Sequence, residues 1–236
     1  MKRRILHSLY QSFHLWSADY TIACKKGCSA CCTQNVTITA LEGEEILEYI
    51  QEQNMSKWLA EKLNLPPAHT PAQLTNNDFA CACLQGKEVE YRHDHSTAPC
   101  PFLEDDLCKI YQVRPFACRL FISTTPCSTT RPARMIDAYV EASTTLNQLI
   151  EHLGQKGIWG NMLDVLPALC KTKFKDIGML LKTRSNEQAF SRCRTARPLP
   201  GFLLSEEEGP KVVELLDTIF NTTINNKRIE DFLNNR

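Results

Sequence analysis

The sequence predicts a mainly α-helical protein with a few short strands, in which helices wrap an irregular, cysteine-rich core. Two observations lead to this prediction. Apolar residues recur at helical spacing in several long stretches, whereas strand-like segments are short. All of the 12 cysteines except Cys170 and Cys193 lie between Cys24 and Cys127, in a region that prolines interrupt repeatedly.

Composition and charge limit the classes of protein to be considered. The chain has 236 residues, 43% of them hydrophobic, which is enough to bury a core. Lys and Arg (27) balance Asp and Glu (27), so net charge gives no evidence of a nucleic-acid partner, and no stretch reads as a membrane span. We therefore expect one soluble domain over residues 1–236, with a cysteine-rich core at about 20–130 and a helical C-terminal part at about 131–236.

The N-terminal stretch predicts an amphipathic helix. Basic residues at positions 2–4 resemble the start of a signal peptide, but polar residues interrupt the apolar region that should follow. We therefore expect a cytoplasmic, reducing location, where dense cysteines are more often metal ligands than disulfides. The apolar positions that recur at helical spacing are Ile5, Leu6, Leu9, Phe13 and Trp16.

Further elements follow from local signals. Residues 35–39 (NVTIT) favour a short strand, and Thr39 with Glu42 forms a capping box that predicts a helix to about Gln53. The proline-rich residues 65–71 predict a loop.

The C-terminal part predicts two more helices. The first runs from Pro132, which suits a first turn, to Leu153, before Gly154. The second runs from about Pro210 to Phe220, and the acidic residues 206–208 lie just before it, where negative charge is favourable.

The first cysteine motif has the spacing C-x3-C-x2-C-C, and its four sulfurs must be neighbours in space. Packing alone gives no reason to gather free thiols, whereas coordination of a thiophilic ion or iron–sulfur cluster does. Gly27 suits a loop with positive φ around a metal. The members are Cys24, Cys28, Cys31 and Cys32. The last two are adjacent and point in different directions in regular structure, so the pair lies on a turn, serves two metals or includes a non-ligand.

The second group, Cys100, Cys108 and Cys118, lies about seventy residues downstream, so only folding can bring it to the first. Residues 104–106 predict a turn between two ligands. Arg114 and Arg119 flank Cys118, where their charges would lower thiol pKa values and compensate a negative centre.

The two motifs together resemble the zinc- or iron-chelating CxxCxxCC family, the YkgJ-type cysteine-cluster proteins. The resemblance rests on GCSACC at residues 27–32, followed by VTIT, and on CPFL at residues 100–103 with C-x-I-Y-x-x-R-P-x-x-C-R at residues 108–119. The family has two residues between its first two cysteines, whereas three separate Cys24 from Cys28 here. The resemblance implies zinc or iron, in the latter case including a [4Fe–4S] cluster.

The predicted function is therefore metal chelation, through Cys24, Cys28, Cys31, Cys32, Cys100, Cys108 and Cys118. Seven candidates exceed the four thiolates of one zinc ion or one [4Fe–4S] cluster, which implies either two metal centres or spare cysteines. Two alternatives stay open: an iron–sulfur or iron enzyme, since flagellin lysine methylases look like relatives, and a redox or metal-delivery partner protein. The sequence decides neither whether the protein is an enzyme nor which protein partner it has.

The remaining cysteines and two histidines carry weaker signals. Cys127 can be read as a ligand or not. Cys81 and Cys83 fit alternate strand positions or auxiliary ligands. His93 and His95 fit a solvated loop better than a ligand pair. The two C-terminal cysteines, Cys170 and Cys193, fit a core.

Overall fold

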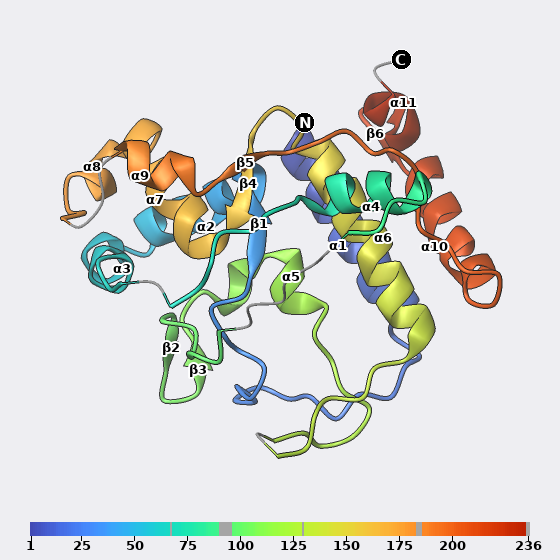
Figure 1. Cartoon of the computed structure of the whole chain (residues 1–236), viewed down its shortest axis with the longest axis horizontal. Helices are drawn as coiled ribbons and strands as arrows, with labels where there is room; N and C mark the ends of the chain where they lie inside the picture. Colours follow the sequence, from blue (N-terminus) through green and yellow to red (C-terminus); the bar gives the residue numbers. More distant parts are fainter. Residues whose placement is uncertain (67, 90–95, 129, 183–185, 235–236) are drawn as a thin grey trace.

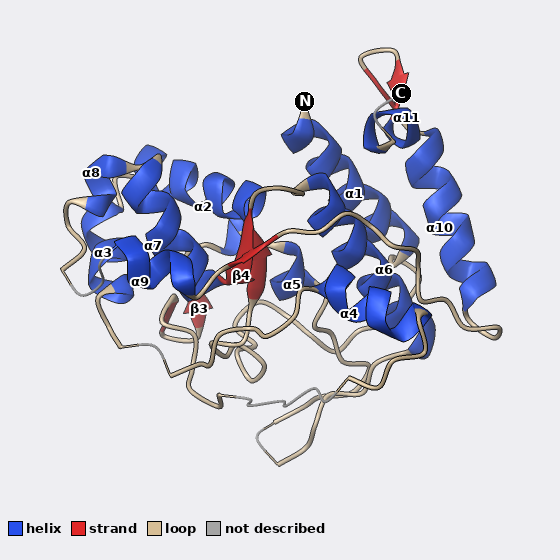
Figure 2. Ribbon diagram, turned by 45° about the horizontal axis from the view of Figure 1, so that its top comes forward, coloured by secondary structure: helices blue, strands red, loops and turns tan. Residues whose placement is uncertain are grey.

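A computed structural model describes all residues except 67, 90–95, 129, 183–185 and 235–236. Helices make up most of the regular structure, and the strands are few and short, as predicted (Figure 2). Within the described residues, no helix is both long and apolar enough to cross a membrane.

The N-terminal half contains five α-helices and one 3-10 helix in its described part. They are α1 (Lys2–Trp16), α2 (Ala40–Glu52), α3 (Ser56–Leu63), α4 (Asn76–Leu84), the 3-10 helix η1 (Tyr111–Val113) and α5 (Phe116–Arg119). The described C-terminal half adds α6 (Asp137–Leu153), α7 (Met162–Thr172), α8 (Lys175–Gly178), α9 (Asn186–Ser191), α10 (Gly209–Asn221) and α11 (Ile229–Leu233).

The strands form three small antiparallel sheets. The largest has the order β1-β4-β5, and it pairs Thr37 with Asn161 and Trp159 with Arg194. Its members are β1 (Thr37–Thr39), β4 (Ile158–Asn161) and β5 (Arg194–Thr195). The other two are hairpins, β2 (Leu103–Glu104) with β3 (Leu107–Cys108) and β6 (Thr223–Ile224) with β7 (Lys227–Arg228).

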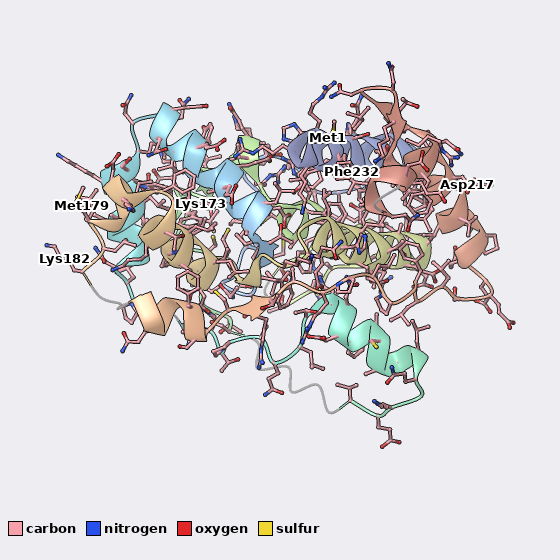
Figure 3. The ribbon with its side chains drawn as sticks, turned by 90° about the horizontal axis from the view of Figure 1, so that it is seen from above. Met1, Lys173, Met179, Lys182, Asp217 and Phe232 are labelled. Atoms are coloured by element: carbon pink, nitrogen blue, oxygen red, sulfur yellow. The ribbon has the colours of Figure 1, made fainter. Side chains whose placement is uncertain are left out.

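Two apolar clusters lie at the two ends of the molecule. The first buries the inner faces of α1, α6, α10 and α11, and the second packs α2, α3, α7 and α8 against β1. Seen from above, Lys173 and Met179 mark the end with the second cluster, and Asp217 and Phe232 mark the opposite end (Figure 3). The sheet β1-β4-β5 lies between the two groups of helices (Figure 1).

The chain after α1, which carries the first cysteine motif, and the chain after α5, which carries Cys127, form irregular loops along one side of the helices. The chain after α1 and the chain after α5 both run along the lower edge of Figure 1, below the central sheet. The backbone N–H of Ala23 donates to the carbonyl of Ser123 (2.8 Å), so these two loops are joined directly.

Several predicted elements are confirmed. Helix α1 buries Ile5, Leu6, Leu9 and Phe13, and the capping box of Thr39 and Glu42 opens α2. Strand β1 occupies the predicted strand segment. Helix α10 begins just after the acidic run.

The start of the longest helix was predicted wrongly. Helix α6 begins at Asp137, not at Pro132. The preceding segment pairs with the chain after α5 instead: the N–H of Thr124 donates to the carbonyl of Arg134 (2.9 Å), and the N–H of Arg134 donates to the hydroxyl of Ser123 (3.1 Å). These tertiary hydrogen bonds hold the segment outside the helix.

The strand reading of Cys81 and Cys83 is also wrong, because both lie on helix α4. A second capping box opens this helix, formed by Thr75 and Asp78. The T-x-x-D pattern at Thr75 and Asp78 is a helix-start signal in the sequence, but the apolar residues 79–84 that follow it show no helical period, so the helix was not predicted.

A buried ionic network fixes the chain around helix α7. His69 Nε2 lies 2.7 Å from one carboxylate oxygen of Asp164, and Arg192 Nε donates to the other (2.7 Å). Burial acts to raise the pKa of Asp164, but the hydrogen bonds and charges of His69 and Arg192 outweigh it and hold the pKa below its usual value. The network joins the loop before α4 to the chain after α9.

Candidate metal centre

One cavity of about 250 Å³ lies between the two cysteine motifs. Its walls come from residues 22–36, from the β2–β3 hairpin, from the chain around α5 and from Met162 at the start of α7. The lining includes every cysteine of the predicted site: Cys24, Cys28, Cys31, Cys32, Cys100, Cys108 and Cys118.

The first motif winds through successive tight turns. The N–H of Cys28 donates to the carbonyl of Lys25 (3.0 Å), and the N–H of Cys32 donates to the carbonyl of Ser29 (2.9 Å). Gly27 has a φ of +86°, the positive value expected from the sequence. These turns gather four sulfurs from nine residues around one opening, where Cys28 and Cys31 are exposed.

Backbone pairing brings the second motif to the first. The N–H of Cys100 donates to the carbonyl of Cys32 (2.9 Å), and the N–H of Gln34 donates to the carbonyl of Ala98 (3.1 Å). Thr33 and Pro99 form the antiparallel bridge between these two hydrogen bonds. Cys32 and Cys100 are therefore held side by side by the backbone itself.

The β2–β3 hairpin positions Cys108, which pairs with Leu103 across the strands. Asp105 and Asp106 form its turn with positive φ values of 50° and 59°, so the turn predicted at residues 104–106 is confirmed. The hydroxyl of Ser29 donates to the carboxylate of Asp106 (2.5 Å), which ties the hairpin back to the first motif.

A buried carboxylate anchors helix α5, which carries Cys118. Glu42 Oε1 accepts the backbone N–H of Phe116 (2.9 Å) and the hydroxyl of Tyr10 (2.8 Å). Its other oxygen accepts the N–H of Thr39 (2.9 Å) in the capping box. The capping box identified Glu42 in the sequence. The role of Glu42 at the site depends on its hydrogen bond with Phe116, which lies 74 residues away in the chain.

Burial favours the protonated form of the thiols of Cys100, Cys108 and Cys118. It raises the pKa of Cys100 to about 11 and is the largest cause of the raised pKa of Cys108 and of Cys118. The charges of Cys100 and Cys108 raise the pKa of Cys118 further. Without metal, these thiols are protonated at neutral pH, so a binding metal must displace their protons.

The adjacent pair Cys31 and Cys32 shares a hydrogen bond. The Cys32 thiol donates to Cys31, which lowers the pKa of Cys31 and raises that of Cys32. The first proton is therefore lost readily from the pair and the second is held strongly.

The two arginines pack on aromatic rings near the cavity. The Arg114 guanidinium lies 3.5 Å from the centroid of Tyr111, and that of Arg119 lies 4.8 Å from the centroid of Tyr10. The charge of Arg114 acts to lower the pKa of Cys118, as expected from the sequence, but burial outweighs it.

The donor set fits a thiophilic metal, since sulfur is the predominant ligand type around the cavity. The thiols line one cavity, but they do not point at a common centre. Among the described residues, no group of three or more His, Cys, Asp or Glu side chains is arranged to hold a metal ion. Metal binding would therefore require side chains on these loops to turn toward a common centre.

The other cysteines lie elsewhere, with one exception. Cys81 and Cys83 are on α4, and Cys170 is fully buried in the second apolar cluster, where Cys193 packs at its edge. Cys127 lies close enough to Cys24 for its charge to act on that thiol. His93 and His95 lie outside the described residues.

Sequence reasoning missed Ile22 and Leu107, two apolar residues that line the cavity. They are exposed at 47% and 45%, so the cavity has apolar side chains accessible to solvent. Their spacing carries no helix or strand period, and no sequence signal separates them from other loop residues.

Replacement of Gly27 by alanine should weaken metal binding. An added Cβ meets no atom within 4 Å, so the cost is that of the positive φ alone, about 1–2 kcal/mol, or roughly tenfold in metal affinity. Gly86→Ala is the matched control, because Gly86 also has a positive φ (+66°) and open space but follows α4. Competition with a chromophoric chelator measures the metal affinity of each variant. Equal affinities in the two variants would contradict a role of the turn at Gly27 in metal binding.

Comparison with known families gives one match. The model of the CxxCxxCC family, described as a putative zinc- or iron-chelating domain, matches residues 23–143. This range includes both cysteine motifs and Cys127. Curated proteins and solved structures give no match.

Proposed function

The chain belongs to the CxxCxxCC family of zinc- or iron-chelating domains, and we propose that it binds zinc or iron through the thiolates that line the cavity. One observation carries the proposal. Seven cysteines from two motifs about seventy residues apart line the same cavity. They are Cys24, Cys28, Cys31, Cys32, Cys100, Cys108 and Cys118.

The bound metal would hold the loops together. Thiolates from both motifs on one centre would join residues 22–36, which have no helix or strand, to residues 100–118, whose elements β2, β3, η1 and α5 are short. A structural zinc site contributes about 10–16 kcal/mol of apparent binding free energy, against about 5–15 kcal/mol for the net stability of a whole domain. We therefore propose that the metal stabilises this part of the fold.

A second candidate is a metal-delivery or redox partner protein. Cys28 and Cys31 are exposed, and the pKa of Cys31 is lowered, so this edge could exchange metal or react with another thiol. An iron–sulfur enzyme would use the same cavity, with the exposed apolar side chains beside it contacting a substrate.

Metal analysis after anaerobic purification tests the proposal. We expect stoichiometric zinc or iron, and a tighter apparent affinity as pH rises, because metal must displace protons from thiols of raised pKa such as Cys100. A brown protein with visible absorption indicates an iron–sulfur cluster, and a colourless zinc protein indicates a structural or delivery role. Protein with neither metal, and no uptake of zinc or iron on reconstitution, would refute metal chelation.

A further inference from the structure

Eight cysteines, the seven that line the cavity together with Cys127, fall into two groups of four when backbone contacts are followed. The inner group is built on the pairing of Cys32 with Cys100, and the β2–β3 hairpin and α5 add one cysteine each. Its members are Cys32, Cys100, Cys108 and Cys118. All four are half-buried.

The outer group is built on the contact between the loops after α1 and α5. Ala23 donates its N–H to the carbonyl of Ser123, and the backbone of Ser123 hydrogen-bonds the Cys24 sulfur. Cys127 follows four residues after Ser123, so this double contact keeps Cys127 near Cys24. Cys28 and Cys31 come from the same turns as Cys24.

The electrostatic interactions between the thiols agree with this division. Cys24 is acted on by the charges of Cys28, Cys31 and Cys127. In the inner group, the charges of Cys100 and Cys118 act on Cys32, and those of Cys100 and Cys108 act on Cys118. The two groups meet at the hydrogen bond between Cys31 and Cys32. The adjacent pair thus belongs to two groups, which resolves the difficulty of directing neighbouring side chains at one ion.

We propose that the chain holds two four-thiolate metal centres, an inner one on Cys32, Cys100, Cys108 and Cys118 and an outer one on Cys24, Cys28, Cys31 and Cys127. The division rests on the proposed metal binding and adds Cys127 as the eighth ligand. Four thiolates complete a tetrahedral zinc site or hold one [4Fe–4S] cluster, so eight ligands leave no spare thiol near the cavity.

Zinc reconstitution of the apo protein tests the division by native mass spectrometry. We expect two zinc ions per chain in the unmodified protein and the loss of one in Cys127→Ser. The matched control is Cys83→Ser, which removes an exposed cysteine on α4 and should keep both ions. Retention of both ions by Cys127→Ser, or loss of both together, would overturn the two-centre arrangement.

Thiol alkylation with peptide mapping gives a second readout that does not depend on a variant's stability. In zinc-loaded protein we expect Cys127 to be protected and Cys83 to react. In zinc-loaded Cys127→Ser, Cys24, Cys28 and Cys31 should become reactive while the inner four stay protected. Protection of the seven others with Cys127 reactive would overturn this inference and leave metal chelation standing, whereas reaction of all eight regardless of zinc would overturn both.

Discussion

Complete removal of metal by a strong chelator is expected to open the cysteine loops while the two groups of helices stay folded. The loop at residues 17–36 has no helix or strand, and the segment at residues 97–128 has only short elements, β2, β3, η1 and α5, so we expect their order to depend on the metal. The apolar clusters that pack α1 with α6 and α2 with α7 take most of their buried residues from helices outside these segments, and Phe102, Ile110 and Phe116 of the second segment add to them. The loss is therefore expected to be local, although a structural zinc site is worth about 10–16 kcal/mol.

Limited proteolysis with peptide mapping, together with circular dichroism, measures this effect. New cleavage should be confined to the two loops, with most of the helical signal retained, and re-addition of zinc or iron should restore resistance. Treatment with chelator already saturated with zinc is the control. Unchanged proteolysis and circular dichroism after complete metal loss would contradict a structural role for the metal.

Replacement of Glu42 by alanine is expected to destabilise the protein by about 3–4 kcal/mol, because several buried donors lose their acceptor at once. The donors are the Tyr10 hydroxyl and the backbone N–H groups of Thr39 and Phe116. Glu42→Gln should cost less, about 1–2 kcal/mol, since the amide keeps one acceptor oxygen. Denaturant unfolding of the metal-loaded protein measures both.

The matched control for Glu42 lies on the same helix. Glu48 pairs with Arg3 at the surface, and such exposed pairs contribute about 0–1 kcal/mol, so Glu48→Gln should change stability little. Glu42→Ala should also weaken metal binding, because Phe116 opens the helix that carries Cys118. Equal unfolding free energies and metal affinities for Glu42→Ala and Glu48→Gln would show that Glu42 does not anchor the site.

Local signals predicted several elements correctly because local contacts form them. The capping box of Thr39 and Glu42 satisfies the first amide groups of α2 within three residues of sequence, and the apolar face of α1 follows from helical period. The start of α6 could not be predicted in this way. Its preceding segment has a hydrogen-bonding partner at residues 123–124, which no local pattern reveals.

The family, the mainly helical class and the candidate cysteines could be predicted from the sequence, because residue spacing and helical period are properties of nearby positions. Only the folded chain shows that Cys32 lies against Cys100, that Glu42 anchors the helix of Cys118, and that Cys127 lies near Cys24. Each of these contacts joins residues that are far apart in the chain. Such contacts depend on the packing of the whole fold, so the seven cysteines around one cavity could be proposed from the motifs but placed only by the structure.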